Sequence, residues 1–264
     1  MTDYKKLFDL SGRVALVIGG GSGIGQAAAQ ALAAHGAHCV VADLVRDGAQ
    51  QTCGLIDAAG GRADAAEVDV VSTASVDALV AGVVAAHGRI DVLLTTPARN
   101  LRKRLLDYRD DEFDQVIDLN LKGTFRVARA VGRQMREQRG GSMVLMSSMR
   151  AYSVEPGQSI YAATKAGIGQ MCKGLATELA PYGVRVNALA PGIVETPLTR
   201  PITSDRGWNQ AYASRAALGR WAEASEMAGP VVFLASDAAS YLTATVIHAD
   251  AGWTVIDGRY QPPV

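Results

Sequence analysis

The chain has 264 residues, of which 48% are hydrophobic and 20% are charged. These are ordinary values for a globular protein, and they exclude wholesale disorder. Lys and Arg number 26 and Asp and Glu also number 26, so the formal net charge is zero. We therefore predict no nucleic-acid partner and no membrane partner. The length fits one large α/β domain or two small ones.

The first ten residues, MTDYKKLFDL, mix acids and bases and contain no apolar stretch of the kind found in secretory signals. Cys39, Cys53 and Cys172 are scattered without CxxC or zinc-ligand spacing, which argues against a disulfide scaffold or a structural metal site. We expect a cytoplasmic protein. The histidines also share no spacing pattern and are assigned no metal: His35, His38, His87 and His248.

Residues 14–42 carry no formal charge, and hydropathy alone would suggest a membrane span there. Glycines cluster between positions 19 and 25, however, where a continuous helix would be weakest. The segment is better interpreted as a strand, a glycine turn, a helix and a second strand. The expected first strand is Val14–Ile18, the helix is Ile24–His35 and the second strand is Cys39–Ala42.

The same alternation continues along the chain. Further apolar strands are expected at Ile90–Leu94, Met143–Met146 and Val184–Leu189, and further helices at Val76–His87, Asp111–Arg136 and Ser159–Pro181. Apolar strands that alternate with amphipathic helices indicate a parallel sheet covered on both faces. With no linker, repeat or low-complexity segment, residues 1–264 are predicted to form a single α/β domain with a doubly wound sheet.

The glycine turn Gly19–Gly25 follows a strand and opens a helix, which suits a pyrophosphate on the helix N-terminus. The second strand leads to Asp43, whose carboxylate can bind ribose hydroxyls and would repel a 2′-phosphate. Leu44 follows it, and Ser22 stands where a basic residue could have met that phosphate. NAD is therefore favoured, while Arg46 leaves NADP open. The alternative is a glycine turn that serves chain geometry only.

Four polar residues form a second pattern. Tyr161 and Lys165 are four residues apart on an expected helix and so share a face, where the lysine can lower the phenol's pKa. Ser148 follows an expected strand, and Asn120 lies in a long helical stretch. Individually they could be a surface tyrosine, a solvated lysine, a turn serine and a helix-surface asparagine. Their joint arrangement favours catalysis.

The sequence resembles the classical short-chain dehydrogenase/reductase family over nearly its whole length. The TGxxxGxG motif is matched at Gly19, Gly23 and Gly25, with Ile18 in place of its threonine. Asp69-Val70 resembles the adenine-binding pair, and Pro191-Gly192 with Thr196 matches a segment that closes over the nicotinamide. The catalytic tetrad is matched by Asn120, Ser148, Tyr161 and Lys165. The resemblance implies a Rossmann-type fold and these cofactor contacts: Gly19, Ser22, Gly23, Ile24, Gly25, Asp43, Leu44, Asp69, Val70, Thr95, Tyr161, Lys165, Pro191, Gly192, Val194 and Thr196.

The resemblance also implies a role for each member of the tetrad. Tyr161 would be the general acid/base, and Ser148 would hold and polarise the carbonyl or alcohol. Lys165 would bind the nicotinamide ribose and tune Tyr161, and Asn120 would position a proton-relay water. The family's NNAG stretch is replaced here by Thr95-Thr96-Pro97-Ala98. Because Pro97 lacks an N–H and Ala98 adds a methyl group, we expect a displaced cofactor, weaker affinity or a rebuilt turn.

The substrate mouth is expected to include a lid over residues 195–221, placed before the last strand. The candidate substrate contacts are Arg99, Arg102, Arg150, Tyr152 and Trp208. Arginines near the mouth suit an anionic or polyhydroxylated substrate, although solvated loop arginines are the alternative. Small residues along Ser159–Pro181 suit packing on another subunit as well as on the sheet. With the family resemblance they favour a homotetramer, with Gly252-Trp253 and Tyr260–Val264 near a subunit boundary.

We therefore predict an NAD(H)-dependent enzyme that interconverts a secondary alcohol and a ketone, with a sugar, polyol or hydroxy acid as the favoured small-molecule substrate. The rival enzyme is an NADP(H)-dependent 3-oxoacyl thioester reductase. The rival of another class is a non-catalytic dinucleotide-binding regulator or scaffold, supported by the altered stretch at 95–98 and opposed by the intact tetrad.

Overall fold

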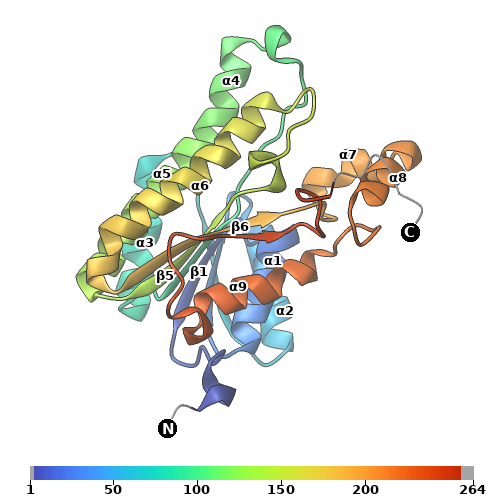
Figure 1. Ribbon diagram of the computed structural model, residues 1–264. Coiled ribbons are helices and arrows are strands. Elements are labelled where there is room, and N and C mark those ends of the chain that lie inside the picture. The colour runs from blue at the N-terminus through green and yellow to red at the C-terminus, as the bar shows by residue number, and fades with distance from the viewer. Residues whose placement is uncertain (1–2, 257–264) are drawn as a thin grey trace.

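The computed structural model describes residues 3–256, and a seven-stranded sheet runs through its centre (Figure 1). All its strands are parallel, in the order β3-β2-β1-β4-β5-β6-β7. The strands are β1 (Val14–Ile18), β2 (His38–Asp43), β3 (Arg62–Glu67), β4 (Val92–Thr95), β5 (Gly141–Met146), β6 (Val184–Pro191) and β7 (Val246–Ala249). This confirms the predicted doubly wound sheet.

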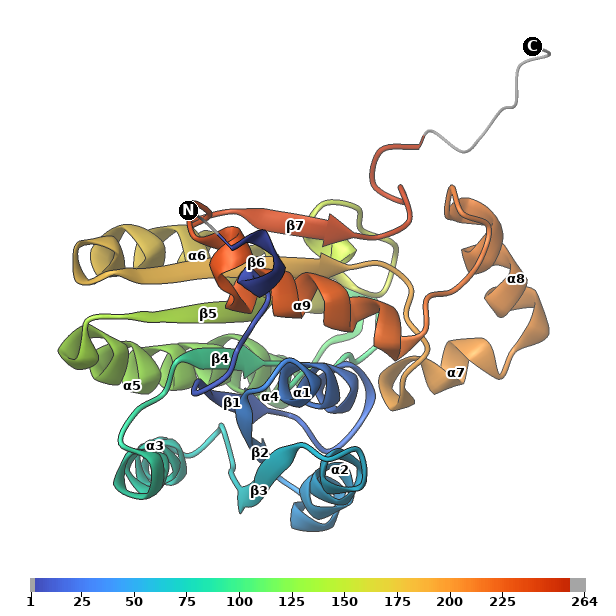
Figure 2. The ribbon, with the colours of Figure 1, turned by 90° about the horizontal axis from the view of Figure 1, so that it is seen from below.

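Helices cover both faces of the sheet (Figure 2). One face is covered by α1 (Gly23–Ala34), α2 (Arg46–Ala58) and α9 (Ala228–Ala235), and the other by α3 (Thr73–His87), α5 (Gly123–Gln138) and α6 (Ser159–Leu179). The remaining helices are α4 (Asp110–Ile117), α7 (Arg200–Thr203) and α8 (Arg206–Arg215). Of these, α7 and α8 lie to one side of the two helical layers (Figure 1).

Strand β1 shows why this sequence needs two helical layers. Leu16 and Ile18 belong to the core beneath α3, α5 and α6, whereas Ala15 and Val17 belong to the core beneath α1, α2 and α9. Successive side chains of a strand point to opposite faces, so a wholly apolar strand must be covered twice.

Strand β3 and helix α2 were not predicted from the sequence. Strand β3 reads RADAAE, with exposed and partly buried positions in place of an apolar run. It lies at the edge of the sheet beside β2, so its pairing partner and not its own hydrophobicity defines it. Strand β4 begins at Val92, two residues later than expected, and the carboxylate of Asp91 just before it accepts a hydrogen bond from the Val14 N–H at 2.9 Å.

The expected helix at 111–136 is interrupted once. A π-helical turn over Asp118–Lys122 joins α4 to α5 and contains the fully buried Asn120. Such turns are rare and occur frequently at functional sites. In the described part of the chain no helix is long and apolar enough to span a membrane. The predicted boundary residues Tyr260–Val264 lie outside the described residues.

Candidate active site

A cleft of about 360 Å³ opens where β1, β2, β4, β5 and β6 end. The strand order reverses between β1 and β4, and open α/β sheets bind ligands at such a point, beyond the carboxyl ends of their strands. Sixteen of the predicted site residues line this one cleft: Gly19, Ser22, Gly23, Ile24, Gly25, Asp43, Leu44, Asp69, Val70, Ser148, Tyr161, Lys165, Pro191, Gly192, Val194 and Thr196.

Two glycines of the turn have no room for a side chain. Gly19 has a φ of +80°, and a Cβ there would lie 2.3 Å from Thr96 Oγ1. A Cβ on Gly25 would lie 2.1 Å from the Gly19 carbonyl oxygen. Because the chain is this tightly folded, the backbone itself lines the cleft and helix α1 begins directly at it with free N–H groups.

Asp43, the last residue of β2, is held in place by the backbone around it. Its Oδ2 accepts a hydrogen bond from the Gly21 N–H at 2.9 Å, and its Oδ1 accepts one from the Val45 N–H at 3.2 Å. The carboxylate therefore stays ordered at the wall of the cleft. A carboxylate at this place can still accept hydrogen bonds from ribose hydroxyls, since each oxygen has more than one lone pair.

The stretch that departs from the family pattern is bonded to strand β1 and to the glycine turn. Thr96 donates its N–H to the Ile18 carbonyl oxygen at 2.9 Å, and its hydroxyl lies 3.1 Å from the Gly19 carbonyl oxygen. Thr96, Pro97 and Ala98 line the cleft, whereas the predicted contact Thr95 is buried within β4. Thr96 was not among the predicted site residues, because it lies 77 residues beyond the glycine that its hydroxyl contacts.

Strand β5 and helix α6 are joined beneath the cleft by Lys165. Its Nζ donates a hydrogen bond to the Met146 carbonyl oxygen at 2.8 Å, and Ser147 Oγ donates one to the Lys165 carbonyl oxygen at 2.9 Å. Lys165 Nζ also lies 5.6 Å from the centroid of the Tyr161 ring. The predicted pair therefore shares one face of α6, turned toward the end of β5.

Burial dominates the titration of this pair. It lowers the pKa of Lys165 to about 8. Burial also raises the pKa of Tyr161, while a hydrogen bond with Ser148 and the charges of Arg150 and Arg102 act in the opposite direction. We expected the pKa of the Tyr161 phenol to be lowered by Lys165, but its net shift is upward. Removal from water penalises the charged form of each group and outweighs the neighbouring charges.

Ser148 stands two residues beyond β5, at the start of a short 3-10 turn over Met149–Ala151. It is buried, and its Oγ accepts a hydrogen bond from the Arg150 N–H at 3.1 Å. This bond fixes the Ser148 hydroxyl at the wall of the cleft that Tyr161 also lines. Two hydroxyl groups are thereby available to one oxygen atom of a bound substrate.

Asn120, unlike Ser148, Tyr161 and Lys165, does not line the cleft. Its Oδ1 accepts a hydrogen bond from the Arg99 N–H at 2.8 Å, and its Nδ2 donates to the Arg99 carbonyl oxygen at 2.9 Å. Nδ2 also lies 3.2 Å from Thr164 Oγ1 on α6. The side chain is fully buried and lies behind the cleft lining. It fastens the segment after β4 to the helix that carries Tyr161 and Lys165.

A charged network lies at the predicted substrate mouth. Glu155 accepts hydrogen bonds from Arg102 at 2.5 Å and from the Tyr212 hydroxyl, and forms an ion pair with Arg150 at 3.1 Å. Burial raises the pKa of Glu155, but its bonds to Tyr212 and Arg102 and the charge of Arg150 together hold it below the usual value. Glu155 was not among the predicted site residues, because an isolated loop glutamate carries no sequence signal.

The five candidate substrate residues separate into two groups. Arg102, Arg150 and Trp208 belong to the charged network around Glu155. The Arg102 guanidinium lies 4.8 Å from the centroid of the Trp208 ring, and Arg150 is almost fully buried beneath Tyr212. Arg99 is fixed through its backbone by Asn120. Tyr152 is half exposed, and its ring lies 4.4 Å from that of His248. It therefore packs toward β7, outside the cleft lining.

Residues 195–221 contain α7 and α8 and share a small apolar cluster of their own. Ile202, Tyr212 and Trp221 pack there with Met149 from the loop after β5. Tyr212 stacks on Trp221 with ring centroids 5.7 Å apart and hydrogen-bonds Arg150 at 2.9 Å. This segment is therefore attached to the mouth by one aromatic cluster and one polar network.

The residues present fit a nicotinamide dinucleotide. The glycine turn is so tightly folded that Gly19 and Gly25 leave no space for a Cβ, α1 offers N–H groups to a pyrophosphate, and Asp43 faces the place expected for a ribose. At the other end of the same cleft, Ser148, Tyr161 and Lys165 converge. Fold and site thus define a dinucleotide-dependent oxidoreductase.

Comparison with known proteins gives the family. The family model described as enoyl-(acyl carrier protein) reductase matches residues 19–254. The short-chain reductase protein NovJ of Streptomyces niveus is 41% identical over 244 residues, which cover 90% of this chain and 93% of the relative. The chain belongs to the classical short-chain dehydrogenase/reductase family, and the predicted resemblance is confirmed.

Two further relatives have more specific descriptions. The 3-oxoacyl-[acyl-carrier-protein] reductase FabG of Thermotoga maritima is 37% identical, with 93% of this chain and 99% of the relative covered. The crystal structure of a gluconate 5-dehydrogenase from Burkholderia cenocepacia in complex with NADP and tartrate matches with a TM-score of 0.91 and 33% identity, covering 95% of this chain and 98% of that one. The chain is therefore an NAD(P)-dependent dehydrogenase or reductase.

Proposed function

We propose that the protein interconverts a secondary alcohol and a ketone with NAD(H) as cofactor. The observation that carries this proposal is the convergence of Ser148, Tyr161 and Lys165 on the cleft that the glycine turn and Asp43 line at its other end. A non-catalytic regulator would not need this combination of groups.

The bound cofactor supplies a nicotinamide ring that accepts or gives the hydride. Tyr161 moves the proton at the substrate oxygen, and Ser148 donates a hydrogen bond to that oxygen as negative charge develops on it. Lys165 would hold the nicotinamide ribose, and its positive charge near the Tyr161 ring favours the deprotonated phenol. Asn120 acts by positioning, because its amide secures the Arg99 backbone and α6.

The preference for NAD(H) over NADP(H) is supported by Asp43. Its carboxylate is ordered by Gly21 and Val45 at the cleft wall, where it would repel a 2′-phosphate. The Burkholderia relative is described with NADP, so the two cofactors must be compared directly. A catalytic efficiency with NAD(H) that exceeds that with NADP(H) supports the proposal, and the reverse ranking overturns it.

We propose a hydroxy acid or sugar acid as the substrate class. At the mouth, the guanidinium groups of Arg102 and Arg150 share the single carboxylate of Glu155, which leaves one positive charge in excess. Arg150 also donates its backbone N–H to Ser148 Oγ at 3.1 Å, so the network adjoins the site hydroxyl. A substrate carboxylate would balance that excess. The tartrate in the Burkholderia structure supports the same class.

The second candidate is a 3-oxoacyl thioester reductase, which the similarity to FabG favours. A panel of sugar acids, neutral polyols and 3-oxoacyl thioesters, assayed by NADH and by NADPH absorbance, separates the two. We expect turnover with the acids, and an Arg150→Met variant should raise KM for acids about tenfold or more while neutral polyols are little affected. Exposed Arg104, replaced in the same way, is the control. Turnover of thioesters alone would favour the second candidate.

We further propose that residues 195–221 act as a lid over the substrate, that four copies assemble, and that the enzyme works in the cytoplasm. The attachment of Tyr212 to Glu155 supports a segment that can open as a unit. Buried, unpaired cysteines support a reducing compartment. Light scattering after size-exclusion chromatography tests the tetramer. A mass equal to that of one chain would contradict it.

A further inference from the structure

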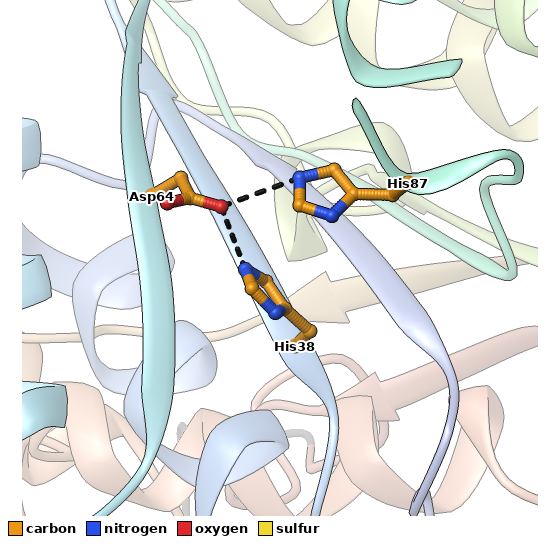
Figure 3. Close-up of side chains that lie close together, drawn as sticks. All are labelled: His38, Asp64 and His87. Carbon is orange, nitrogen blue, oxygen red and sulfur yellow. Dashed lines mark hydrogen bonds and ion pairs between the residues drawn. The ribbon is translucent and has the colours of Figure 1, made fainter. Parts of the chain in front are cut away.

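Three ligand-type side chains meet at the end of the sheet opposite the cleft. His38 is the first residue of β2, Asp64 lies within β3, and His87 is the last residue of α3. The Nε2 atoms of His38 and His87 lie 2.6 Å and 3.2 Å from the same oxygen, Asp64 Oδ2 (Figure 3). The histidines share no pattern in the sequence, yet the fold brings two of them to one carboxylate.

The parallel register of β2 and β3 explains why His38 and Asp64 lie close together. His38 is paired with Arg62 and Val40 with Asp64, so alternate residues of both strands face the same side of the sheet. Helix α3 packs on that side, where Val76, Val80 and Val83 share a core with Val40. The helix ends at His87 because Gly88 takes the left-handed conformation, and its last turn is thus placed over the two strands.

The geometry is close to that of a metal site. One ligand atom from each residue lies within 4.8 Å of the other two. A tetrahedral Zn²⁺ with bonds of about 2.0–2.1 Å needs ligand atoms roughly 3.3 Å apart. The His87–Asp64 distance of 3.2 Å already meets this, and the His38–Asp64 distance of 2.6 Å must widen. The Asp64 side chain is 56% exposed and therefore has room to move.

The charge balance also favours a cation. Within residues 3–256, Asp64 forms ion pairs with the two imidazoles and with no lysine or arginine. The carboxylate is thus not neutralised by a permanent positive charge. The C-terminal end of α3 adds the partial negative charge of its free carbonyl groups.

We propose that His38, Asp64 and His87 bind one Zn²⁺ per chain, with solvent at the fourth position. The ion would link β2, β3 and the end of α3. Asp43 closes the other end of β2, five residues from His38, so the site lies about 16 Å along the strand from the cofactor cleft. The ion would therefore stabilise the fold and would not take part in catalysis, which makes this proposal independent of the proposed function.

Isothermal titration of tag-free protein with ZnCl₂ is the direct test. We expect one Zn²⁺ per chain in the wild type and binding at least about tenfold weaker in His38→Gln and His87→Gln. His35→Gln, which changes an exposed histidine on another element, should bind as the wild type does. Absence of binding by the wild type, or unchanged affinity in His87→Gln, would overturn the proposal.

Thermal unfolding gives a second test that tolerates a less stable variant. Saturating Zn²⁺ should raise Tm of the wild type by about 5 °C or more and leave Tm of Asp64→Asn unchanged relative to its own metal-free value. Co²⁺ should give the visible absorption bands of a tetrahedral site in the wild type only. Equal Tm shifts in both proteins would show that the three residues form hydrogen bonds alone and would refute the site.

Discussion

The ammonium group of Lys165 donates a hydrogen bond to the carbonyl oxygen of Met146 at 2.8 Å, although both residues are buried. This bond joins the end of β5 to the second turn of α6, and so it helps to set the distance between Ser148, which follows β5, and Tyr161, which lies on α6. The same lysine thus has two functions that are physically linked. It completes the framework of the site and brings a positive charge close to the phenol.

Replacement of Tyr161 by Phe should leave cofactor binding near the wild-type level while turnover falls about 10²–10⁴-fold in both directions, because the proton donor and acceptor is lost. Turnover is measured by NADH absorbance and binding by NADH fluorescence. Tyr241→Phe, which alters a fully exposed tyrosine, is the matched control. Near-normal turnover of Tyr161→Phe would rule out the catalytic assignment.

The buried Lys165 should make stability depend on pH. Its folded-state pKa of about 8 lies below its ordinary value of 10.5, so between these limits the unfolded chain binds more protons than the folded chain. The free energy of unfolding therefore gains from this group as pH rises. Relative to Lys165→Met, the wild type should gain about 3 kcal/mol between pH 8 and pH 10.5, a value read from urea denaturation.

Lys173→Met provides the comparison for that series, since Lys173 is exposed on the same helix. Its pH dependence should follow that of the wild type. If Lys165→Met also follows the wild type between pH 8 and pH 10.5, the lysine is not titrating as its burial requires.

Asp43→Ala should change the cofactor preference. Loss of hydrogen bonds to a charged acceptor costs about 1.5–3 kcal/mol, so KM for NAD should rise about 10- to 100-fold. Removal of the negative charge should at the same time improve the use of NADP. Asp47→Ala, at an exposed position in the first turn of α2, should leave both values unchanged. An unaltered NAD/NADP ratio in Asp43→Ala would contradict the proposed preference.

Thr96→Val tests the contact between the turn after β4 and the glycine turn. The substitution keeps the shape of the side chain but removes the hydroxyl that bonds to the Gly19 carbonyl oxygen. The glycine turn should loosen, and the dissociation constant of NADH should rise about 3- to 10-fold, as expected for one lost hydrogen bond. Fluorescence titration measures it, with exposed Thr73→Val as the control. Unchanged NADH affinity would show that the backbone alone holds the turn.

Features that depend on short stretches of sequence were predicted correctly. The apolar strand β1, the glycine turn and the opening of α1 are contiguous, so local periodicity and the conformational freedom of glycine determine them. Tyr161 and Lys165 were placed on one helix face because four residues make about one turn. The sheet type followed from the alternation of apolar strands and helices.

Features that depend on pairing between distant segments appeared only in the tertiary structure. Strand β3 exists because β2 provides its hydrogen-bonding partner, and Asp64 reaches His38 and His87 only through that register and the packing of α3. Burial reversed the expected shift of the Tyr161 pKa, since desolvation is a property of the folded core and not of spacing. Local structure and the types of reactive side chain can be predicted from the sequence. Strand register, burial and the net effect of neighbouring charges can be determined only from the tertiary structure.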